Sequence, residues 1–364
     1  MLLAAALSSG CASRGGPSVI FPTQGDRFFV SGYHPYWAGD VWTEYPFGAL
    51  DELYVFEIEV GADGTVIAPH GWPDRWTALT AAAAESGVRV TPTVSMHDPV
   101  AFEALFEDHV RIDRLIDTVE RLMRQDARVS GVHLDIEVFQ PVRPGARDGF
   151  VAFVAGLRDR LDSLDPNMTL SLFVPAFDDD DVYNERALGR LVDFLVVQGY
   201  DLHSAGEETT GPVAGLGGWG RLNWEAVVDR FIEFGVPPRK IVMSIPLFGY
   251  EWPSESDRPG ARTRGRATIV PLLAPENVLP ELPRAFEQAA RHGLRRDEVS
   301  GTPYYAFRDE SGWRQGWFED AESLRAKYRF VRQRGLGGVA IFPLAYGDAA
   351  LWADLLAAFA EPRF

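Results

Sequence analysis

The chain has a single cysteine, Cys11, among its 364 residues, so no disulfide can form within it. Basic residues are also few: 35 Lys and Arg stand against 52 Asp and Glu, which gives a net charge of −17. Proteins that bind nucleic acid or anionic membranes gather lysine and arginine on one surface, so this charge argues against both kinds of partner. After the first residues, no apolar run approaches the ~20 residues that a membrane-spanning helix needs.

The residues before Cys11 resemble the signal of a bacterial lipoprotein, in which the cysteine is lipidated and becomes the mature N-terminus. Leu2 to Leu7 form an apolar stretch, and small residues lead from it to the cysteine. The stretch is shorter than usual, and no Lys or Arg precedes it. We expect residues 1–27 to be a signal segment and linker, and the protein to be exported, either as a lipoprotein of the cell envelope or as a secreted protein. The alternative is an unstructured tail with an incidental cysteine.

Eight apolar runs predict strands, and they alternate with segments of helical pattern. Within a helix expected over 101–124, for example, Leu105, Val110, Leu115 and Val119 recur near a 3.6-residue period. Strands that alternate with amphipathic helices form parallel sheets covered by helices. Eight such units predict an α/β protein with a (β/α)8 TIM barrel. The expected strands are 28–33, 52–58, 88–94, 131–137, 169–174, 194–200, 240–246 and 338–344.

The chain is longer than this barrel requires, because a minimal one needs about 250 residues. The surplus follows the seventh strand, where a polar segment rich in proline and arginine precedes a helix expected over 282–292. We therefore expect an insertion over 253–302 that overhangs the carboxyl ends of the strands. The barrel itself is expected to be built from 28–252 and 303–362.

The fourth expected strand carries the residues that point to a function. In Ser130–Glu137, apolar residues alternate with His133, Asp135 and Glu137, so these three side chains share one face of the strand. In a closed parallel barrel, outward side chains pack under helices and inward side chains fill the interior. The polar groups are then expected to point inward, near the carboxyl end of the strand, where barrel active sites lie. Burial of such groups costs several kcal/mol unless they are partnered, so chemistry is the expected reason for their presence.

Separate segments of the chain resemble glycoside hydrolase family 18, the chitinase-like hydrolases. The fourth-strand motif of that family, Asp-Gly-x-Asp-x-Asp-x-Glu, is matched by Ser130–Glu137, and its sixth-strand Met-x-Tyr-Asp by Gln198–Asp201. Ser244–Tyr250 is similar to Gly-Ile-Pro-x-Tyr-Gly, and Gly335–Phe342 to Gly-Leu-Gly-Gly-x-x-x-Trp. Gly32–Trp37 resembles the first strand, so the likeness runs in order through the barrel. The resemblance implies that the insertion after the seventh strand is a small α+β unit.

This resemblance implies a retaining glycosidase that cleaves β-1,4 bonds beside an N-acetylglucosamine-type sugar. In the family, the substrate's own 2-acetamido oxygen attacks the anomeric carbon, an exception to the two-carboxylate scheme. Glu137 then matches the general acid and base, Asp135 the aspartate that orients the acetamido group, and Tyr200 the tyrosine that binds its carbonyl. Asp201 is expected to line the same subsite. A structural ion-pair network for the two carboxylates, and an ordinary core position for Tyr200, are the alternatives.

The chain departs from the family pattern at three site positions. His133 replaces the aspartate that pairs with Asp135; a histidine there would hydrogen-bond Asp135 and, if protonated, lower its pKa. Phe342 replaces the tryptophan under the sugar, and Gln198 replaces a methionine and adds a polar group. Aromatic faces stack on sugars, although core packing explains any one aromatic residue equally well. The further candidates for substrate binding are Trp37, Trp219, Tyr250 and Trp252.

The sequence gives no reason to expect a metal, a nucleotide or another cofactor, because its histidines lack metal-ligand spacing and no glycine-rich phosphate loop occurs. The expected partner is a polysaccharide or oligosaccharide that contains N-acetylglucosamine: chitin oligomers, peptidoglycan fragments or a glycoprotein glycan. The oligomeric state stays open. Two other functions compete: a non-catalytic carbohydrate-binding protein, which would usually lack the acid glutamate, and an envelope scaffold, which would have lost Glu137, Asp135 and Tyr200 at random.

Overall fold

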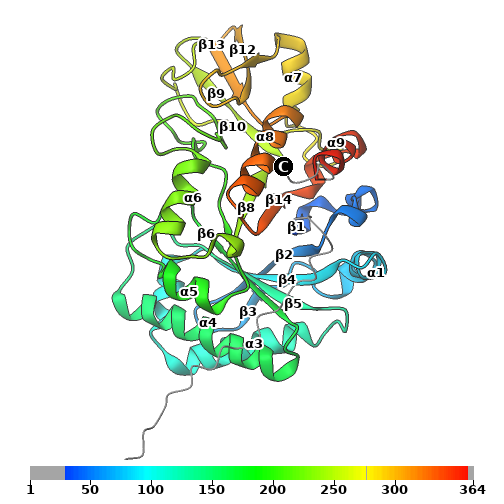
Figure 1. The fold of residues 1–364 in the computed structure, drawn as a ribbon, viewed down its shortest axis with the longest axis vertical. Coiled ribbons are helices and arrows are strands. Elements are labelled where there is room, and N and C mark those ends of the chain that lie inside the picture. The colour runs from blue at the N-terminus through cyan, green and yellow to red at the C-terminus, as the bar shows by residue number, and fades with distance from the viewer. Residues whose placement is uncertain (1–28, 276, 360–364) are drawn as a thin grey trace, which may run out of the picture.

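The computed structural model describes residues 29–275 and 277–359. Within these ranges, eight parallel strands form a barrel in the order β1-β14-β8-β7-β6-β5-β4-β2, which closes because β1 pairs with both β14 and β2. The predicted (β/α)8 barrel is confirmed (Figure 1). A short strand, β3 (Val66–Ala68), extends β2 in an antiparallel pair. The barrel strands are β1 (Phe29–Pro35), β2 (Glu52–Val60), β4 (Arg89–Met96), β5 (Gly131–Ile136), β6 (Thr169–Val174), β7 (Phe194–Val197), β8 (Ile241–Pro246) and β14 (Gly338–Phe342).

Helices follow the barrel strands and cover the outside of the barrel (Figure 1). They are α1 (Thr77–Glu85), α2 (Pro99–Phe106), α3 (His109–Met123), α4 (Pro144–Leu164), α5 (Glu185–Leu191), α6 (Trp224–Glu233), α8 (Ala321–Gln333) and α9 (Ala349–Phe359). Short 3-10 helices are η1 (Tyr36–Ala38), η2 (Val41–Glu44), η3 (Phe47–Ala49), η4 (Asp74–Trp76), η5 (Pro238–Lys240) and η6 (Leu344–Tyr346). Over the described part of the chain, every helix is too short or too polar to cross a membrane.

The helix expected over 101–124 is two helices, α2 and α3. The side chain of Asp108 accepts hydrogen bonds from the backbone N–H groups of Val110 and Arg111, which is the arrangement that starts a new helix. Val110 was expected on the buried stripe. It lies instead in the first turn of α3 and is 67% exposed, because the chain turns at Asp108.

The alternation predicted for the fourth barrel strand, β5, is confirmed by two separate hydrophobic clusters. The outward side chains Val132, Leu134 and Ile136 are fully buried between the strands and the helices. The inward side chains of the barrel form a second, mostly aromatic cluster. Its members are Tyr33, Tyr54, Phe56, Phe173, Phe194, Val196, Val242 and Ala340.

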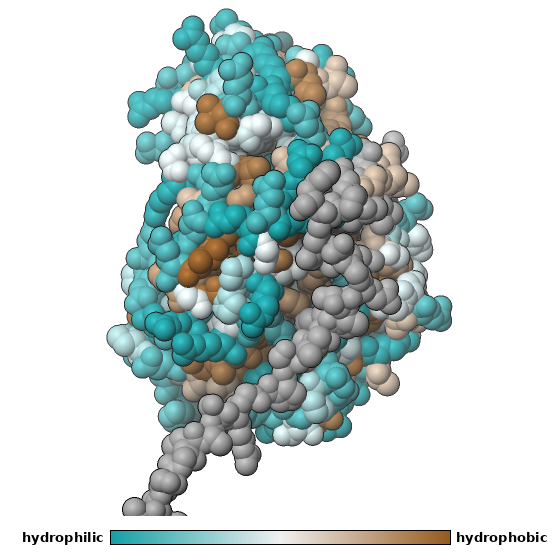
Figure 2. Space-filling view, viewed as in Figure 1, coloured by the Kyte–Doolittle hydropathy of each residue, from teal (hydrophilic) through white to brown (hydrophobic). Residues whose placement is uncertain are grey.

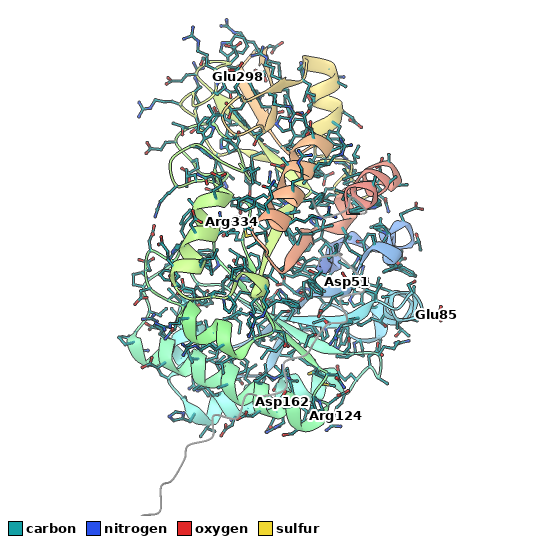
Figure 3. All side chains as sticks on the ribbon, viewed as in Figure 1. Asp51, Glu85, Arg124, Asp162, Glu298 and Arg334 are labelled. Atoms are coloured by element: carbon teal, nitrogen blue, oxygen red, sulfur yellow. The ribbon has the colours of Figure 1, made fainter. Side chains whose placement is uncertain are left out.

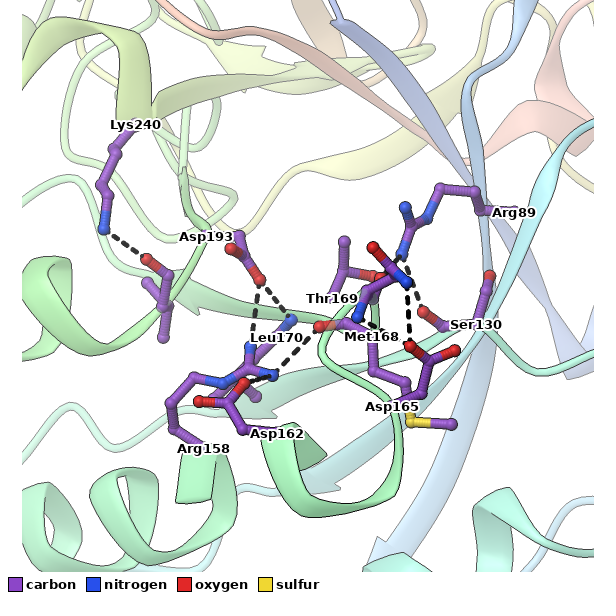
Figure 4. A network of polar contacts seen from close by, with 12 residues as sticks. Arg89, Ser130, Arg158, Asp162, Asp165, Met168, Thr169, Leu170, Asp193 and Lys240 are labelled. Atoms are coloured by element: carbon purple, nitrogen blue, oxygen red, sulfur yellow. Dashed lines mark hydrogen bonds and ion pairs between the residues drawn. The ribbon is translucent and has the colours of Figure 1, made fainter. Parts of the chain in front are cut away.

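Polar contacts tie together the amino ends of the strands, at the opposite end of the barrel from the predicted site (Figure 4). The guanidinium of Arg89, at the start of β4, donates to the carbonyl oxygens of Ser130 and Asn167, which precede β5 and β6. Arg158 on α4 donates to Asp193, which precedes β7. The strands are thereby held in register at this end, and the carboxyl ends remain available for a site.

A second sheet of five antiparallel strands follows β8 in the chain and has the order β10-β9-β13-β12-β11 (Figure 1). Helix α7 (Ala285–His292) packs against β12 and falls in the predicted helix over 282–292. The sheet reaches beyond 253–302 on both sides, so Pro303–Phe307 pairs within it rather than within the barrel. Its strands are β9 (Phe248–Ser254), β10 (Thr268–Pro271), β11 (Arg295–Arg296), β12 (Pro303–Asp309) and β13 (Gly312–Trp317).

The face of the molecule in Figure 2 is largely hydrophilic, with small apolar areas between the charged ones. This agrees with a chain whose net charge is −17. Cys11 and the rest of the predicted signal segment, 1–27, lie outside the described residues. The signal segment, the linker and the lipidation of Cys11 therefore stay predictions.

Candidate active site

The carboxyl ends of the barrel strands surround a cavity of about 340 Å³. Asp135 on β5 and Glu137 directly after it line this cavity, as do Gln198, Tyr200 and Asp201 after β7. The other lining residues are mostly aromatic and come from β1, β2, β6, β9, β10, β14 and the loops beside them. They are Tyr33, Trp37, Phe56, Phe139, Phe173, Phe248, Tyr250, Ile269, Phe342 and Tyr346.

The side chains of Asp135 and Glu137 form a hydrogen-bonded carboxyl pair in this cavity. Burial raises the pKa of both groups, and the charge of Asp135 raises that of Glu137 further. Two adjacent carboxyl groups in a site of low polarity cannot both ionise cheaply, so the pair retains one proton. The stronger rise at Glu137 assigns the proton to that residue, which is the state that a general acid requires.

The backbone on either side of Glu137 is held by a residue that sequence reasoning missed, Tyr183. Its hydroxyl donates to the carbonyl oxygen of Ile136 at 2.8 Å and accepts from the backbone N–H of Val138 at 2.8 Å. Asp178, in the loop between β6 and α5, accepts from the backbone N–H of Tyr183 at 2.7 Å. Both contacts of the Tyr183 hydroxyl are to backbone atoms at the end of β5, so no residue pattern in the sequence predicts them.

The loop after β7 presents Tyr200 and Asp201 to the cavity. Asp201 has a φ of 57°, in the left-handed region that Asp tolerates better than most residues. Its carboxylate accepts a hydrogen bond from the Tyr250 hydroxyl at 2.8 Å, which ties this loop to β9 of the second sheet. Gly199 allows the close approach that the turn requires, since a Cβ there would lie 2.1 Å from the carbonyl oxygen of Ser244. Burial, followed by the charge of Glu137, raises the pKa of the Tyr200 phenol, which therefore stays protonated and can donate.

Phe342, predicted to lie under the sugar, lines the cavity and is fixed by other aromatic rings. Its ring centroid lies 5.4 Å from that of Tyr33 and 5.7 Å from that of Phe56, both in edge-on contacts. The ring of Tyr200 stacks nearly parallel to it at 6.0 Å. Such mutual packing holds a flat apolar face in the cavity, as sugar stacking requires.

Two aromatic residues of the cavity lining are unusually exposed. Trp37 is 39% exposed, and its indole N–H donates to the hydroxyl of Tyr346 at 3.4 Å. Phe139, two residues beyond Glu137, is 62% exposed and was not predicted. The signal for it was the strand alternation, which continues from Glu137 to Phe139. Exposed aromatic faces at a cavity mouth are suited to contact with a sugar polymer.

His133 does not contact the cavity and does not hydrogen-bond Asp135, so that expectation was wrong. Its Nε2 lies 2.8 Å from the hydroxyl of Tyr33 and its Nδ1 2.8 Å from the hydroxyl of Ser171, which occupies both ring nitrogens. The imidazole also stacks on the ring of Tyr54 at 4.2 Å. Burial lowers its pKa to about 3, so His133 is neutral and carries no charge that could lower the pKa of Asp135.

Trp219 and Trp252, two of the predicted substrate-binding residues, also lie away from the cavity lining. Trp252 is on β9, is fully buried, and packs edge-on against Tyr250 at 5.6 Å. It was expected to bind substrate because it follows the seventh barrel strand, but that segment continues as β9 into the second sheet and turns the indole into the core. The indole N–H of Trp219 donates to Asp297 at 2.9 Å, in the same part of the molecule.

Glu57 and His97 lie beside Asp135 and were not predicted as site residues. The carboxylate oxygens of Glu57 and Asp135 and a ring nitrogen of His97 all lie within 4.8 Å of one another. Glu57, Glu59 and His70, all partly buried, form a second such group. Side chains of these types can hold a metal ion, but acidic groups commonly lie this close without one, so the spacing alone does not make either group a metal site.

A closed parallel barrel with an acidic, aromatic-lined cavity at the carboxyl ends of its strands is the arrangement of a barrel enzyme that acts on carbohydrate. Comparison with known proteins identifies the family. The model of the glycosyl hydrolases family 18 matches residues 44–347, so the chain belongs to that family. The predicted class, a glycosidase of the chitinase-like family, is confirmed at the level of the family.

The chain is similar to the cortical fragment-lytic enzyme of Bacillus anthracis, with 25% identity over 258 residues that cover 68% of this chain and 53% of that enzyme. It thus spans about half the length of this curated relative. Among solved structures, it resembles a chitinase from Chromobacterium violaceum, with a TM-score of 0.72, 25% identity, and coverage of 92% of this chain and 99% of the other. A class V chitinase from Nicotiana tobaccum shares the fold, with a TM-score of 0.79, 16% identity, and coverage of 93% and 100%.

Proposed function

We propose that this protein is a retaining glycosidase that hydrolyses β-1,4 bonds in glycans containing N-acetylglucosamine, with Glu137 as general acid and base. The observation that carries the proposal is the hydrogen-bonded pair of Asp135 and Glu137 in a cavity that also contains Tyr200. A carboxyl group that keeps its proton near neutral pH can protonate the oxygen of the leaving sugar. The aromatic lining and the absence of Lys and Arg from it suit a sugar that carries no negative charge.

The proposed reaction uses the substrate's 2-acetamido group as nucleophile. Its carbonyl oxygen attacks the anomeric carbon while Glu137 gives its proton to the leaving oxygen, and an oxazolinium intermediate forms. Asp135, ionised, accepts a hydrogen bond from the acetamido N–H and stabilises the positive charge, and the hydroxyl of Tyr200 donates to the acetamido oxygen. Glu137, now a carboxylate, takes a proton from the water that opens the intermediate. The anomeric configuration is retained because the centre is inverted twice.

The family resemblance supports two polymers as substrates, namely chitin oligomers and peptidoglycan fragments. The similarity to a chitinase favours chitin oligomers, and the similarity to a cortical fragment-lytic enzyme favours peptidoglycan fragments. A non-catalytic carbohydrate-binding protein is the second candidate function, and the replacement of the motif residues by His133 and Phe342 is the observation in its favour. Retention of Glu137 at the cavity favours catalysis.

The stereochemistry of the product tests the proposed mechanism. Proton NMR of the chain with N-acetylglucosamine oligomers should show the β anomer first, followed by slow equilibration with the α anomer. The same oligomers with the acetyl groups removed should not be cleaved, because the acetamido oxygen that acts as nucleophile is missing. Initial release of the α anomer, or cleavage of the deacetylated oligomers at a similar rate, would exclude the acetamido mechanism. Binding without turnover of either polymer would support the second candidate function.

The location of the protein is a further part of the proposal. Lipid attachment at Cys11 would anchor the enzyme in the bacterial cell envelope, and cleavage without lipidation would release it as a secreted protein. The support is the pattern of residues 2–13. Labelling of expressing cells with a radioactive fatty acid, in comparison with the Cys11→Ala variant, tests the anchor: label in the first and none in the second is the expected result.

A further inference from the structure

Asp135 is approached by two groups from strands other than its own. Glu57 lies on β2 at an irregularity where the pairing with β4 shifts between Val55 and Ile58, and His97 follows the last residue of β4. The Nε2 atom of His97 lies 3.5 Å from a carboxylate oxygen of Glu57, and both groups lie within 4.8 Å of the carboxylate of Asp135. The three side chains therefore meet at the carboxyl ends of three neighbouring strands, β2, β4 and β5.

The carboxyl groups around Asp135 need a positive charge nearby, and His97 can supply it. Asp135 is 95% buried (5% exposed), and its Oδ1 has no hydrogen-bond partner among the described residues. It contacts Glu137, and it lies within 4.8 Å of Glu57, whose side chain is only 10% exposed. Three carboxyl groups are thus gathered in a poorly solvated space, and His97 is the group beside them that can carry a positive charge. His133 does not serve this purpose, because burial keeps it neutral and both its nitrogens are engaged elsewhere.

We propose that Glu57 and His97 form a positioning pair for Asp135, in which Glu57 holds the imidazolium of His97 next to Asp135 and so keeps that carboxylate ionised while Glu137 carries the proton. The inference rests on the proposed function, because it assumes that turnover needs an ionised Asp135 and a protonated Glu137. Glu57 and His97 act on the catalytic residues through Asp135, and neither is assigned a contact with substrate.

The directions of the pKa shifts agree with this arrangement. The carboxylate of Glu57, 3.5 Å from the ring, raises the pKa of His97 above its ordinary value, and the charge of Asp135 raises it further, against the effect of partial burial. In return, burial raises the pKa of Asp135 to about 7, and the charge of His97 is the largest influence that opposes this rise. The other titratable groups that face Asp135 from the surrounding elements are Tyr33 on β1, Glu137 after β5, Tyr183 before α5 and Tyr200 after β7.

The first test follows His97 itself and does not depend on turnover. In proton–carbon NMR, the ring signal of His97, assigned by its loss in His97→Gln, is titrated in the full chain and in Glu57→Gln. Removal of the Glu57 carboxylate should move the His97 midpoint to lower pH. An unchanged midpoint would overturn the pair, whatever the enzyme does with sugars.

The second test is the pH profile of kcat/KM on the 4-methylumbelliferyl conjugate of chitobiose. His97→Gln removes the positive charge that favours ionised Asp135. The acid limb of the profile should therefore move to higher pH by about one unit, so that kcat/KM falls roughly tenfold at pH values below the limb. At alkaline pH, where His97 is neutral in the native protein, the two profiles should converge. His97→Lys restores the charge and should return the limb to the native position or below it. His109→Gln, at the exposed start of α3, is the matched control and should leave the limb in place.

The outcomes separate the two proposals. If the native chain cleaves the conjugate but His97→Gln and His97→Lys shift the limb equally, the role of His97 is structural and the inference fails. If EDTA moves the limb of the native chain, a bound cation supplies the charge and the inference also fails. If the native chain cleaves no substrate, the proposed function fails, and the titration of His97 in Glu57→Gln still decides whether the pair exists.

Discussion

The Nε2 atom of His133 lies 2.8 Å from the hydroxyl of Tyr33, inside the barrel beneath the carboxyl pair. The contact joins β5 to β1 across the barrel interior, and Ser171 on β6 occupies the other ring nitrogen. The third polar residue of the fourth-strand motif therefore supports the barrel rather than the reacting groups. Substitution of His133 should therefore change the stability of the fold and leave the pH dependence of activity unchanged.

His133→Asn should weaken the fold and leave the pH limbs of the native enzyme in place. The shorter amide cannot keep the stacking on Tyr54 or both hydrogen bonds, so the free energy of unfolding should fall by about 2 kcal/mol. Urea unfolding measures this loss. Because His133 is neutral throughout the assay range, the acid limb should not move. A limb that shifts as far as in His97→Gln would show that His133 contributes to the charge at Asp135.

Tyr183→Phe should lower kcat about tenfold and leave KM nearly unchanged. The hydroxyl fixes the backbone on both sides of Glu137, so its loss lets the acid drift from the productive position without altering the sugar contacts. Steady-state kinetics on the chitobiose conjugate measures both constants. Tyr304→Phe, in the second sheet, removes a similar hydroxyl outside the cavity and serves as the control. A rise in KM with an unchanged kcat would contradict the positioning role.

Trp252→Phe should reduce stability by about 2 kcal/mol and have little effect on KM. The side chain is fully buried in the second sheet, so the smaller ring leaves a cavity in the core. Trp37→Ala should do the reverse, because Trp37 is 39% exposed at the cavity: KM should rise several-fold, with little change in the unfolding midpoint. Thermal unfolding and steady-state kinetics of the two variants decide between these assignments. A higher KM in Trp252→Phe would return that residue to the substrate site.

Glu137→Gln should be more stable than the native chain at pH 8, and the difference should shrink towards pH 5. Burial raises the pKa of Glu137 above its value in the unfolded chain, so the folded state binds this proton more tightly. Its contribution to stability is complete below the unfolded pKa and is lost as the pH rises towards the folded pKa. Each pKa unit in this window is worth about 1.4 kcal/mol. Melting temperatures at the two pH values measure the effect, and equal differences at both would contradict a raised pKa.

The sequence was sufficient for the barrel and for the residues on the motif strands. Period-2 alternation and the order of strands and helices placed Asp135 and Glu137 at one end of a closed sheet. The family resemblance added Tyr200 and Asp201, and all four line one cavity. Phe342, predicted from the family resemblance, and Trp37, predicted as a candidate aromatic residue, also line the cavity. These inferences work because strand direction and alternation decide on which face, and at which end, a side chain lies.

The rest depended on contacts that no local pattern encodes. Trp252 has the same spacing from the seventh barrel strand whether that segment forms a loop or a strand, and only its pairing in the second sheet buries it. Glu57 and His97 belong to strands with no recognised motif, and the irregular pairing of β2 brings one towards the other. Tyr183 acts through backbone atoms, which every residue possesses. Tertiary contacts of these three kinds can be identified only once the three-dimensional structure is known.

The role of Glu137 is tested by the release of 4-methylumbelliferone from chitobiose and chitotriose conjugates between pH 4 and 9. The native chain is compared with Glu137→Gln, and with Glu298→Gln as a control on the exposed loop between β11 and β12 (Figure 3). We expect a bell-shaped profile for the native chain and for the control, and a loss of at least about a hundredfold in Glu137→Gln at every pH. Turnover by Glu137→Gln within a few-fold of the native rate would contradict the central claim that Glu137 is the acid and base of this glycosidase.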